Sequence, residues 1–249
     1  MSAAPTTDAV PVLHADGITA GYVPEVDIIS DVELVCAEGE LVGIIGPNGA
    51  GKSTLVKALF GLVDVRRGAV SFRGGDITAL PAHAMVSRGV GYVPQVRNVF
   101  SMLSVEDNLR MGAYLAPGRF DERRDAVVEL FPVLAHRLRT QAGSLSGGQR
   151  QMLAMARALM TEPAVLLLDE PSAGLSPMMQ DQVFDWIEGI NDAGTAVVMV
   201  EQNARRCLQI CDRGYVLDSG SNAYEATGAE LLRDPKVVEL YLGSLARVE

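Results

Sequence analysis

The most informative stretch of this sequence is Gly46-Pro47-Asn48-Gly49-Ala50-Gly51-Lys52-Ser53-Thr54. It matches the pattern G-x-x-x-x-G-K-[ST], and it stands between the apolar run Leu41–Ile45 and an amphipathic segment, residues 52–61. Its glycines allow backbone N–H groups to converge on a phosphate, and the N-terminus of the following helix adds a positive dipole end. We therefore predict a strand, a loop and a helix that bind a nucleoside triphosphate. Lys52 can reach the β- and γ-phosphates, and the Ser53 hydroxyl can ligate Mg²⁺.

Two carboxylates, Asp169 and Glu170, directly follow the apolar run of residues 165–168. Such a run is typical of a parallel strand that is buried on both faces, and α/β sheets bind their ligands where such strands end. Asp169 can orient Mg²⁺ through a water, and Glu170 can polarise the attacking water as a general base. By itself the pattern also fits a strand that ends in a solvated acidic turn. Together with the phosphate loop it predicts hydrolysis of a nucleoside triphosphate.

The charge of the chain argues against one class of function. Its 249 residues include 31 acidic and 21 basic side chains, which gives a net charge of −10. A protein that binds nucleic acid by general attraction to phosphates needs a basic excess instead. No apolar run approaches the ~20 residues that cross a bilayer, and residues 1–10 lack the basic and apolar segments of a secretory signal. We therefore expect a soluble, cytoplasmic chain that binds no nucleic acid.

The residues between the motifs predict how the chain is organised. β-Branched runs alternate with turns up to residue 72, whereas residues 101–140 have helical patterns, with Ser104 as an N-cap. The predicted parts are a loose leader (1–11), one α/β domain (12–243) with a helical insertion (about 96–144), and a tail (244–249). The predicted helices include residues 105–114 and 121–131 of the insertion and a single C-terminal helix, residues 229–242.

A third motif, Leu145-Ser146-Gly147-Gly148-Gln149, precedes the strand that ends in Asp169. Ser146 can cap a helix over residues 149–160, and the two glycines allow a phosphate to approach closely. The pentapeptide resembles the signature sequence of ABC-type ATPases, and the resemblance covers residues 12–243. It implies an ABC-type P-loop ATPase cassette: an α/β fold with an antiparallel β subdomain and a helical insertion. It also implies that the pentapeptide contacts the γ-phosphate bound to a partner subunit, so that two subunits enclose two ATP molecules.

The same resemblance assigns roles to other positions. Tyr22 stands where an aromatic residue stacks on adenine, and Gln95 stands where a glutamine touches Mg²⁺ and couples the insertion to the nucleotide. Together, motifs and resemblance predict these nucleotide-binding residues: Tyr22, Gly46, Pro47, Asn48, Gly49, Ala50, Gly51, Lys52, Ser53, Thr54, Gln95, Ser146, Gly147, Gly148 and Gln149. The predicted metal-binding residues are Ser53, Gln95 and Asp169. The predicted catalytic residues are Lys52, Glu170 and Gln202.

Two positions depart from the family pattern. Gln202 stands where most ABC ATPases have a histidine that contacts the γ-phosphate, and a glutamine donates a hydrogen bond but cannot carry a positive charge. Our hypothesis is that the site hydrolyses ATP weakly unless a partner supports it. Residues 172–177 stand where the family contacts the opposite subunit, and Ser176 replaces the usual aspartate there. This change puts the hydrogen bond between subunits in doubt.

Four further stretches narrow the resemblance: residues 22–28 (YVPEVDI), 91–94 (GYVP), 201–203 (EQN) and 212–217 (DRGYVL). They are similar to the LivF-type ATP-binding subunit of branched-chain amino-acid importers. That resemblance implies a subunit on the inner face of the cell membrane. Its partners would be a second, nonidentical ATPase (a homodimer is the alternative), two membrane permeases and, indirectly, an extracytoplasmic substrate-binding protein. Its cofactors would be ATP and Mg²⁺.

Other functions stay open on the sequence. Urea and short-amide importers share much of this pattern. A non-transport ABC ATPase is a second alternative, although such proteins usually carry a second cassette, a coiled-coil insertion or a basic surface. A regulatory nucleotide-binding subunit is a third, which Gln202 and Ser176 favour and which Lys52 and Glu170 oppose.

A cluster of apolar side chains follows Gln95: Phe100, Met102, Leu103 and Leu109. They could line a groove for a cytoplasmic helix of a permease. They could equally form the insertion's own core.

Overall fold

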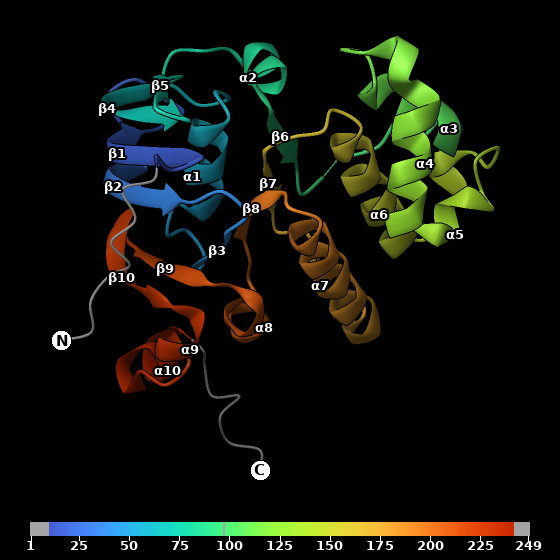
Figure 1. The fold of residues 1–249 in the computed structure, drawn as a ribbon. Helices are drawn as coiled ribbons and strands as arrows, with labels where there is room; N and C mark the ends of the chain where they lie inside the picture. The colour runs from blue at the N-terminus through green and yellow to red at the C-terminus, as the bar shows by residue number, and fades with distance from the viewer. Residues whose placement is uncertain (1–9, 97, 242–249) are drawn as a thin grey trace.

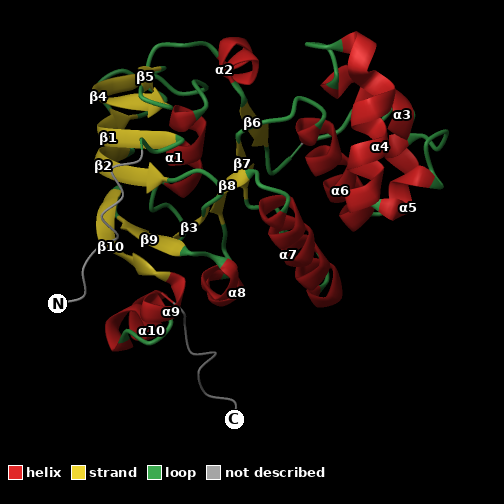
Figure 2. Cartoon of the chain, viewed as in Figure 1, coloured by secondary structure: helices red, strands yellow, loops and turns green. Residues whose placement is uncertain are grey.

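The computed structural model describes residues 10–96 and 98–241 (Figure 1). The predicted tail lies outside the described residues, as does the predicted leader except for its last two positions. Two β-sheets and a separate group of helices make up the fold (Figure 2). This arrangement confirms the predicted α/β fold with an antiparallel sheet and a helical insertion. Within the described residues, no helix combines the length and the apolar character of a transmembrane span.

The larger sheet has six strands, which are parallel except for the edge strand β10. In spatial order they are β10 (Ser221–Thr227), β9 (Arg213–Asp218), β3 (Leu41–Ile45), β8 (Ala196–Val200), β7 (Val165–Asp169) and β6 (Val90–Val93). β3, β7 and β8 are buried at every position, as their continuous apolar runs predict for strands covered on both faces. The parallel strands end at one edge of the sheet, so the loops that follow them lie close together there.

The smaller sheet is antiparallel, with the order β2 (Ile29–Cys36), β1 (Leu13–Ala20), β4 (Val65–Phe72) and β5 (Gly75–Asp76). Helix α1 (Lys52–Leu59) lies between the two sheets. Its Leu55 and Leu59 are fully buried in one core with Ile18 of β1 and Val198 of β8. The phosphate-loop helix is therefore held from both sides.

The helical insertion forms the group at the right of Figure 1, where its helices lie beside α6. Its elements are α3 (Val105–Gly112), η1 (Pro117–Arg119), α4 (Phe120–Leu130), α5 (Pro132–Ala135) and η2 (Ala142–Ser144). Ser104 caps α3 as predicted, because its hydroxyl accepts a hydrogen bond from Asp107 N. α6 (Gly147–Leu159) packs against α3 and α4, and α7 (Pro177–Asp192) packs against α6. α8 (Ala204–Ile210) follows β8, and α2 (Ala82–Arg88) packs on β6.

The prediction of one C-terminal helix is wrong. The segment forms two short helices, α9 (Gly228–Leu231) and α10 (Pro235–Tyr241). Pro235 lacks an N–H and disfavours a helical conformation of the residue before it, so the first helix ends ahead of it. Asp234 then starts the second helix, since its Oδ1 accepts hydrogen bonds from Lys236 N and Val237 N.

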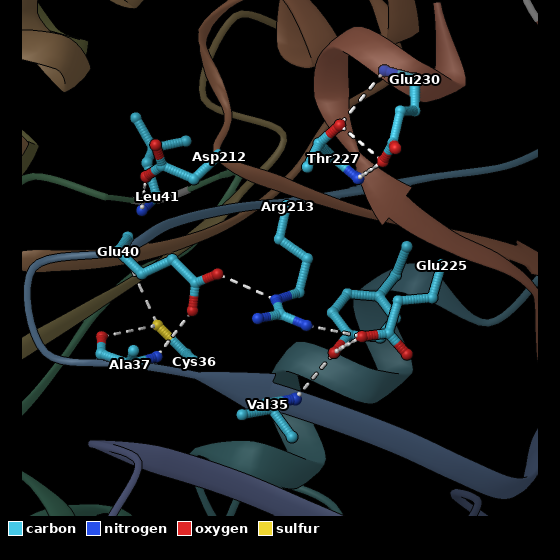
Figure 3. Close-up of polar contacts among 11 residues, drawn as sticks. Val35, Cys36, Ala37, Glu40, Leu41, Asp212, Arg213, Glu225, Thr227 and Glu230 are labelled. Carbon is cyan, nitrogen blue, oxygen red and sulfur yellow. Dashed lines mark hydrogen bonds and ion pairs between the residues drawn. The ribbon is translucent and has the colours of Figure 1, made fainter. Parts of the chain in front are cut away.

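A polar network ties the two sheets together (Figure 3). Arg213 of β9 donates from Nε to Glu40 Oε1 and from Nη1 to Glu225 Oε1, each at 2.8 Å. The Tyr215 hydroxyl donates to Glu225 Oε1 at 3.0 Å and accepts a hydrogen bond from Val35 N of β2 at 3.0 Å. These contacts join strands that lie 180 residues apart in sequence, on the side of the fold away from the phosphate loop.

Candidate nucleotide-binding site

The phosphate loop has a backbone that only glycine adopts easily. Gly46 and Gly51 have φ angles of 149° and 93°. A Cβ on Gly46 would lie 2.1 Å from Leu217 O, and a Cβ on Gly51 would lie 2.5 Å from Ile29 Cγ2. No side chain among the described residues caps the N-terminus of α1, and free N–H groups at such an end can bind an anion. A pocket of about 210 Å³ opens there, lined by Ile28, Asn48, Gly49, Gly51, Lys52, Ser53, Thr54 and Glu170.

Lys52 lies inside this loop. Its buried ammonium donates hydrogen bonds to Gly46 O at 2.9 Å and to Pro47 O at 3.0 Å. Burial lowers the pKa of Lys52, while the negative charges of Glu170, Asp169 and Glu201 act in the opposite direction. An ammonium in this position is ready to exchange carbonyl oxygens for phosphate oxygens.

Asp169 is buried at the end of β7 with one oxygen engaged and one free. Its Oδ2 accepts a hydrogen bond from the Tyr92 hydroxyl at 3.4 Å and lies 3.7 Å from Lys57 Nζ. Its Oδ1 is buried and has no hydrogen-bond partner among the described residues. A buried carboxylate oxygen without a partner fits a water or a hard cation such as Mg²⁺, which prefers oxygen ligands. Ser53 lines the 210 Å³ pocket, and its hydroxyl is a second oxygen of the kind that Mg²⁺ prefers.

Glu170 adopts a left-handed backbone conformation, with a φ of 47°. Such a conformation is strained for a residue with a side chain and is held here by the bond from Glu170 N to Val200 O, at 2.9 Å. Its Oε2 accepts a hydrogen bond from Gln95 Nε2 at 2.7 Å. The structure thus brings together Gln95, Glu170 and Lys52 at the same edge of the sheet: Gln95 and Glu170 lie in the loops after β6 and β7, and Lys52 is the first residue of α1.

Tyr22 lies beside the phosphate-loop helix. Thr54 Oγ1 donates a hydrogen bond to its hydroxyl at 3.5 Å, and 58% of Tyr22 is exposed. An exposed aromatic ring next to the pocket can stack on a base. This geometry is compatible with the role that was predicted for Tyr22.

The signature pentapeptide does not line the 210 Å³ pocket. Ser146 caps α6, its hydroxyl accepting from Gln149 N at 3.3 Å, while Gln149 Oε1 accepts from Ser146 N at 3.2 Å. The structure gives Gly148 a packing role that the sequence reasoning missed, since a Cβ there would lie 2.0 Å from Met179 Cε of α7. The pentapeptide and the phosphate loop therefore do not share this pocket.

Gln202 does not line the 210 Å³ pocket either, and lies in the loop after β8. It is exposed and lines a second cavity, of about 340 Å³, together with Ser172, Gly174, Asn203 and Tyr241. Sequence reasoning assigned no role to its neighbour Glu201, which is buried and accepts hydrogen bonds from this loop and from the loop after Glu170. A carboxylate directly after a buried apolar strand was the signal that could have found it.

Known proteins resemble this chain over most of its length. The profile of the ABC transporter family matches residues 29–173. BraG of Pseudomonas aeruginosa, a high-affinity branched-chain amino acid transport ATP-binding protein, is 43% identical over 223 residues, 89% of this chain and 96% of BraG. LivF of Archaeoglobus fulgidus, a probable branched-chain amino acid transport ATP-binding protein, is 43% identical over 228 residues, 91% of this chain and 96% of LivF.

A solved structure gives the same result at the level of the fold. The nucleotide-free ATP-binding cassette of an ABC transporter superposes with a TM-score of 0.82 and 27% identity, over 92% of this chain and 98% of that one. The chain belongs to the ABC transporter family, as an ATP-hydrolysing subunit. The resemblance that the signature pentapeptide indicated is thereby confirmed.

Proposed function

We propose that this chain is an ATPase subunit of an importer for branched-chain amino acids, on the inner face of the cell membrane. The observation that carries the proposal is the 43% identity to BraG and to LivF over about nine-tenths of the chain, since both are named for transport of these amino acids. The four stretches that resemble LivF-type subunits support it independently of the phosphate loop, which all ABC ATPases share.

In this proposal the residues of the pocket act on ATP. The free N–H groups of α1 and the Lys52 ammonium bind the β- and γ-phosphates, and Tyr22 stacks on adenine. Glu170 takes the proton of the attacking water, for which the bond from Gln95 has to be shared or released. Gln202 donates a hydrogen bond to the γ-phosphate. A general base in this position typically contributes about 10²–10⁴-fold to the rate.

The Ser53 hydroxyl, Gln95 Oε1 and, through a water, Asp169 Oδ1 would hold Mg²⁺. The ion, when bound, offsets the negative charge of the phosphates. Lys57 Nζ lies 3.7 Å from Asp169 Oδ2, and Oδ1, which has no partner among the described residues, is the atom that favours this assignment.

A second ATPase subunit completes each site. The phosphate loop and the capped end of α6 are separate in one chain, so that Ser146 and Gly147 would contact the γ-phosphate held by the partner. We infer a heterodimer with a nonidentical ATPase, in line with the departures at Gln202 and Ser176. Ser176 is exposed at the start of α7, and its side chain caps nothing there.

Two membrane permeases would dock on the insertion, and an extracytoplasmic binding protein would deliver the solute to them. Of the predicted apolar cluster, Leu109 is buried in the insertion's core, whereas Phe100 and Met102 are exposed, Met102 by 83%. The Arg157 guanidinium lies 4.9 Å from the centre of the Phe100 ring, and burial alone lowers its pKa, with no opposing acid in the described part of the chain. An unpaired cation beside apolar side chains suits a permease helix that ends in a carboxylate or in free carbonyls.

Reconstitution tests the proposed solute. The chain, its partner ATPase, both permeases and the binding protein are placed in vesicles, and ATP-dependent uptake of labelled leucine and of labelled urea is compared. Leucine uptake above the urea signal is expected. Uptake of urea alone would mean that the solute is urea and not a branched-chain amino acid. Export of either compound would contradict the proposal that the complex is an importer. Met102→Glu should prevent co-purification of the permeases, while Leu240→Glu, at an exposed position of α10, should not.

A further inference from the structure

Glu201 is a buried carboxylate that none of the proposed catalytic steps uses. It directly follows β8, and only 1% of it is exposed. Its Oε1 accepts a hydrogen bond from Ser172 N at 2.9 Å, and its Oε2 accepts one from Ser172 Oγ at 2.8 Å. Oε2 also accepts from Gln202 N at 3.1 Å and from Asn203 N at 3.4 Å. Four neutral donors therefore converge on one carboxylate.

These donors belong to two loops that both carry a predicted catalytic residue. Ser172 lies two positions after Glu170, and Gln202 itself provides one of the N–H groups. The strands before the loops, β7 and β8, are paired in register, with Asp169 opposite Val200. Beyond the ends of the two strands, the Glu201 side chain connects the loop after β7 to the loop after β8, because it accepts hydrogen bonds from both.

We propose that Glu201 is a positioning residue that fixes the Glu170 loop and the Gln202 loop relative to each other, so that both side chains meet one γ-phosphate. The proposal rests on the proposed roles of Glu170 and Gln202. The two loops also line the 340 Å³ cavity, through Ser172 and Gly174 on one side and Gln202 and Asn203 on the other. A change in their separation would therefore alter the shape of this cavity and the position of Gln202 relative to Glu170.

The carboxylate of Glu201 differs in its donors from the partly buried carboxylate of Glu40. Glu40, which is 12% exposed at its side chain, accepts hydrogen bonds from the guanidinium of Arg213 and from Ala37 N (Figure 3). The donors to Glu201 are all neutral. Burial raises its pKa, and the bonds from Ser172, Gln202 and Asn203 lower it. Such an arrangement holds loops in place, because every donor it engages would otherwise be left without a partner.

Glu201→Gln is the informative substitution. An amide has one accepting oxygen, so its NH₂ group has to face one of the donors that the carboxylate now satisfies. We expect kcat per nucleotide-binding site to fall about tenfold or more, since loss of one well-placed donor costs about 10²-fold at other enzymes. The KM for ATP and its Kd should stay within about twofold, because α1 and Lys52 bind the phosphates independently. Ser172→Ala, which removes one of the four donors, should lower kcat by a smaller factor.

The matched control is Glu40→Gln, which makes the same replacement in the part-buried network around Arg213, before β3 rather than after it. It should lower the Tm without changing kcat per site. An unchanged kcat in Glu201→Gln, or a loss of activity that only follows the folded fraction, would overturn the proposal. If Glu201→Gln does not fold, Ser172→Ala decides: an unchanged kcat then contradicts the proposal. A wild-type complex without ATPase activity would instead contradict the proposed roles of Glu170 and Gln202.

Discussion

Two helix N-termini in this chain, those of α1 and α6, differ in how their backbone N–H groups are satisfied. At α1, Gly51 occupies the N-cap position and no side chain satisfies the free N–H groups. At α6, Ser146 and Gln149 form a complete capping box, in which each side chain bonds to the other's backbone N–H. Both ends carry the positive side of a helix dipole. At α6 the capping box gives side-chain partners to the N–H groups of Ser146 and Gln149, whereas among the described residues no side chain does this at α1.

The difference indicates different tasks. An uncapped N-terminus next to a buried lysine is costly for the empty protein and favourable once an anion binds, so it suits the primary phosphate site. A capped N-terminus is stable without a ligand and can meet a phosphate that the other subunit already holds. The Ser146 hydroxyl can do both, because it accepts from Gln149 N and keeps its own proton to donate.

Lys52→Ala, at the N-terminus of α1, is expected to change the ATPase activity most. Loss of this ammonium should lower kcat/KM by at least about 10²-fold, because a charged donor that contacts the transferred phosphate is removed. ATPase rates and nucleotide binding measure it. Lys236→Ala, on the exposed side of α10, is the matched control and should leave both unchanged. A Lys52 variant with near-normal hydrolysis would mean that the α1 N–H groups suffice alone.

Ser146→Ala tests the role of the capped N-terminus of α6. Removing the cap should cost about 1 kcal/mol of stability, and it should also lower hydrolysis by the assembled pair about tenfold, because the partner's phosphate loses a neutral donor. Thr227→Ala is the control, since Thr227 and Glu230 form the same capping box at α9 (Figure 3). Its Tm should fall by a similar amount while hydrolysis stays constant. If both variants hydrolyse ATP at the same rate, Ser146 caps α6 but takes no part in catalysis.

The N-terminus of α1 could be predicted from the sequence, whereas the N-terminus of α6 could be predicted only in part. The phosphate loop can be recognised from the local sequence, because an apolar strand, fixed glycines and an amphipathic helix follow one another within about 20 residues. The α6 cap was equally local and was predicted from Ser146. The packing of Gly148 on Met179 was not, since the two residues meet only when α7 lies against α6.

Long-range contacts explain the other differences. β4 begins at Val65, and its Arg66 pairs with Asp27, 39 residues away. The bonds from Ser172 to Glu201 span 29 residues, so no local pattern gives Glu201 its role. In each case a polar side chain is placed by a partner that the sequence does not put beside it.

Gln202→His sharpens the comparison at the phosphate itself. The α1 end has one cation, Lys52, and a histidine in the neighbouring loop would add a second group that can be charged. Hydrolysis by the assembled pair should rise by up to about tenfold, and the gain should increase below pH ~6.5, where an unperturbed imidazole is protonated. Rates measured across pH check both parts. An unchanged rate in the complex would contradict the hypothesis that glutamine limits this site.

The smallest effect is expected for Gln149→Glu. Gln149 was predicted to bind nucleotide, yet its side chain turns back to Ser146 N, and a glutamate at this position completes a capping box equally well. Stability should therefore be unchanged or slightly higher, because an acid in the first turn also suits the helix dipole. If Gln149 only caps α6, hydrolysis by the pair should change less than about twofold. If its side chain instead contacts the partner's phosphate, the added negative charge repels it, and hydrolysis falls while the Tm does not.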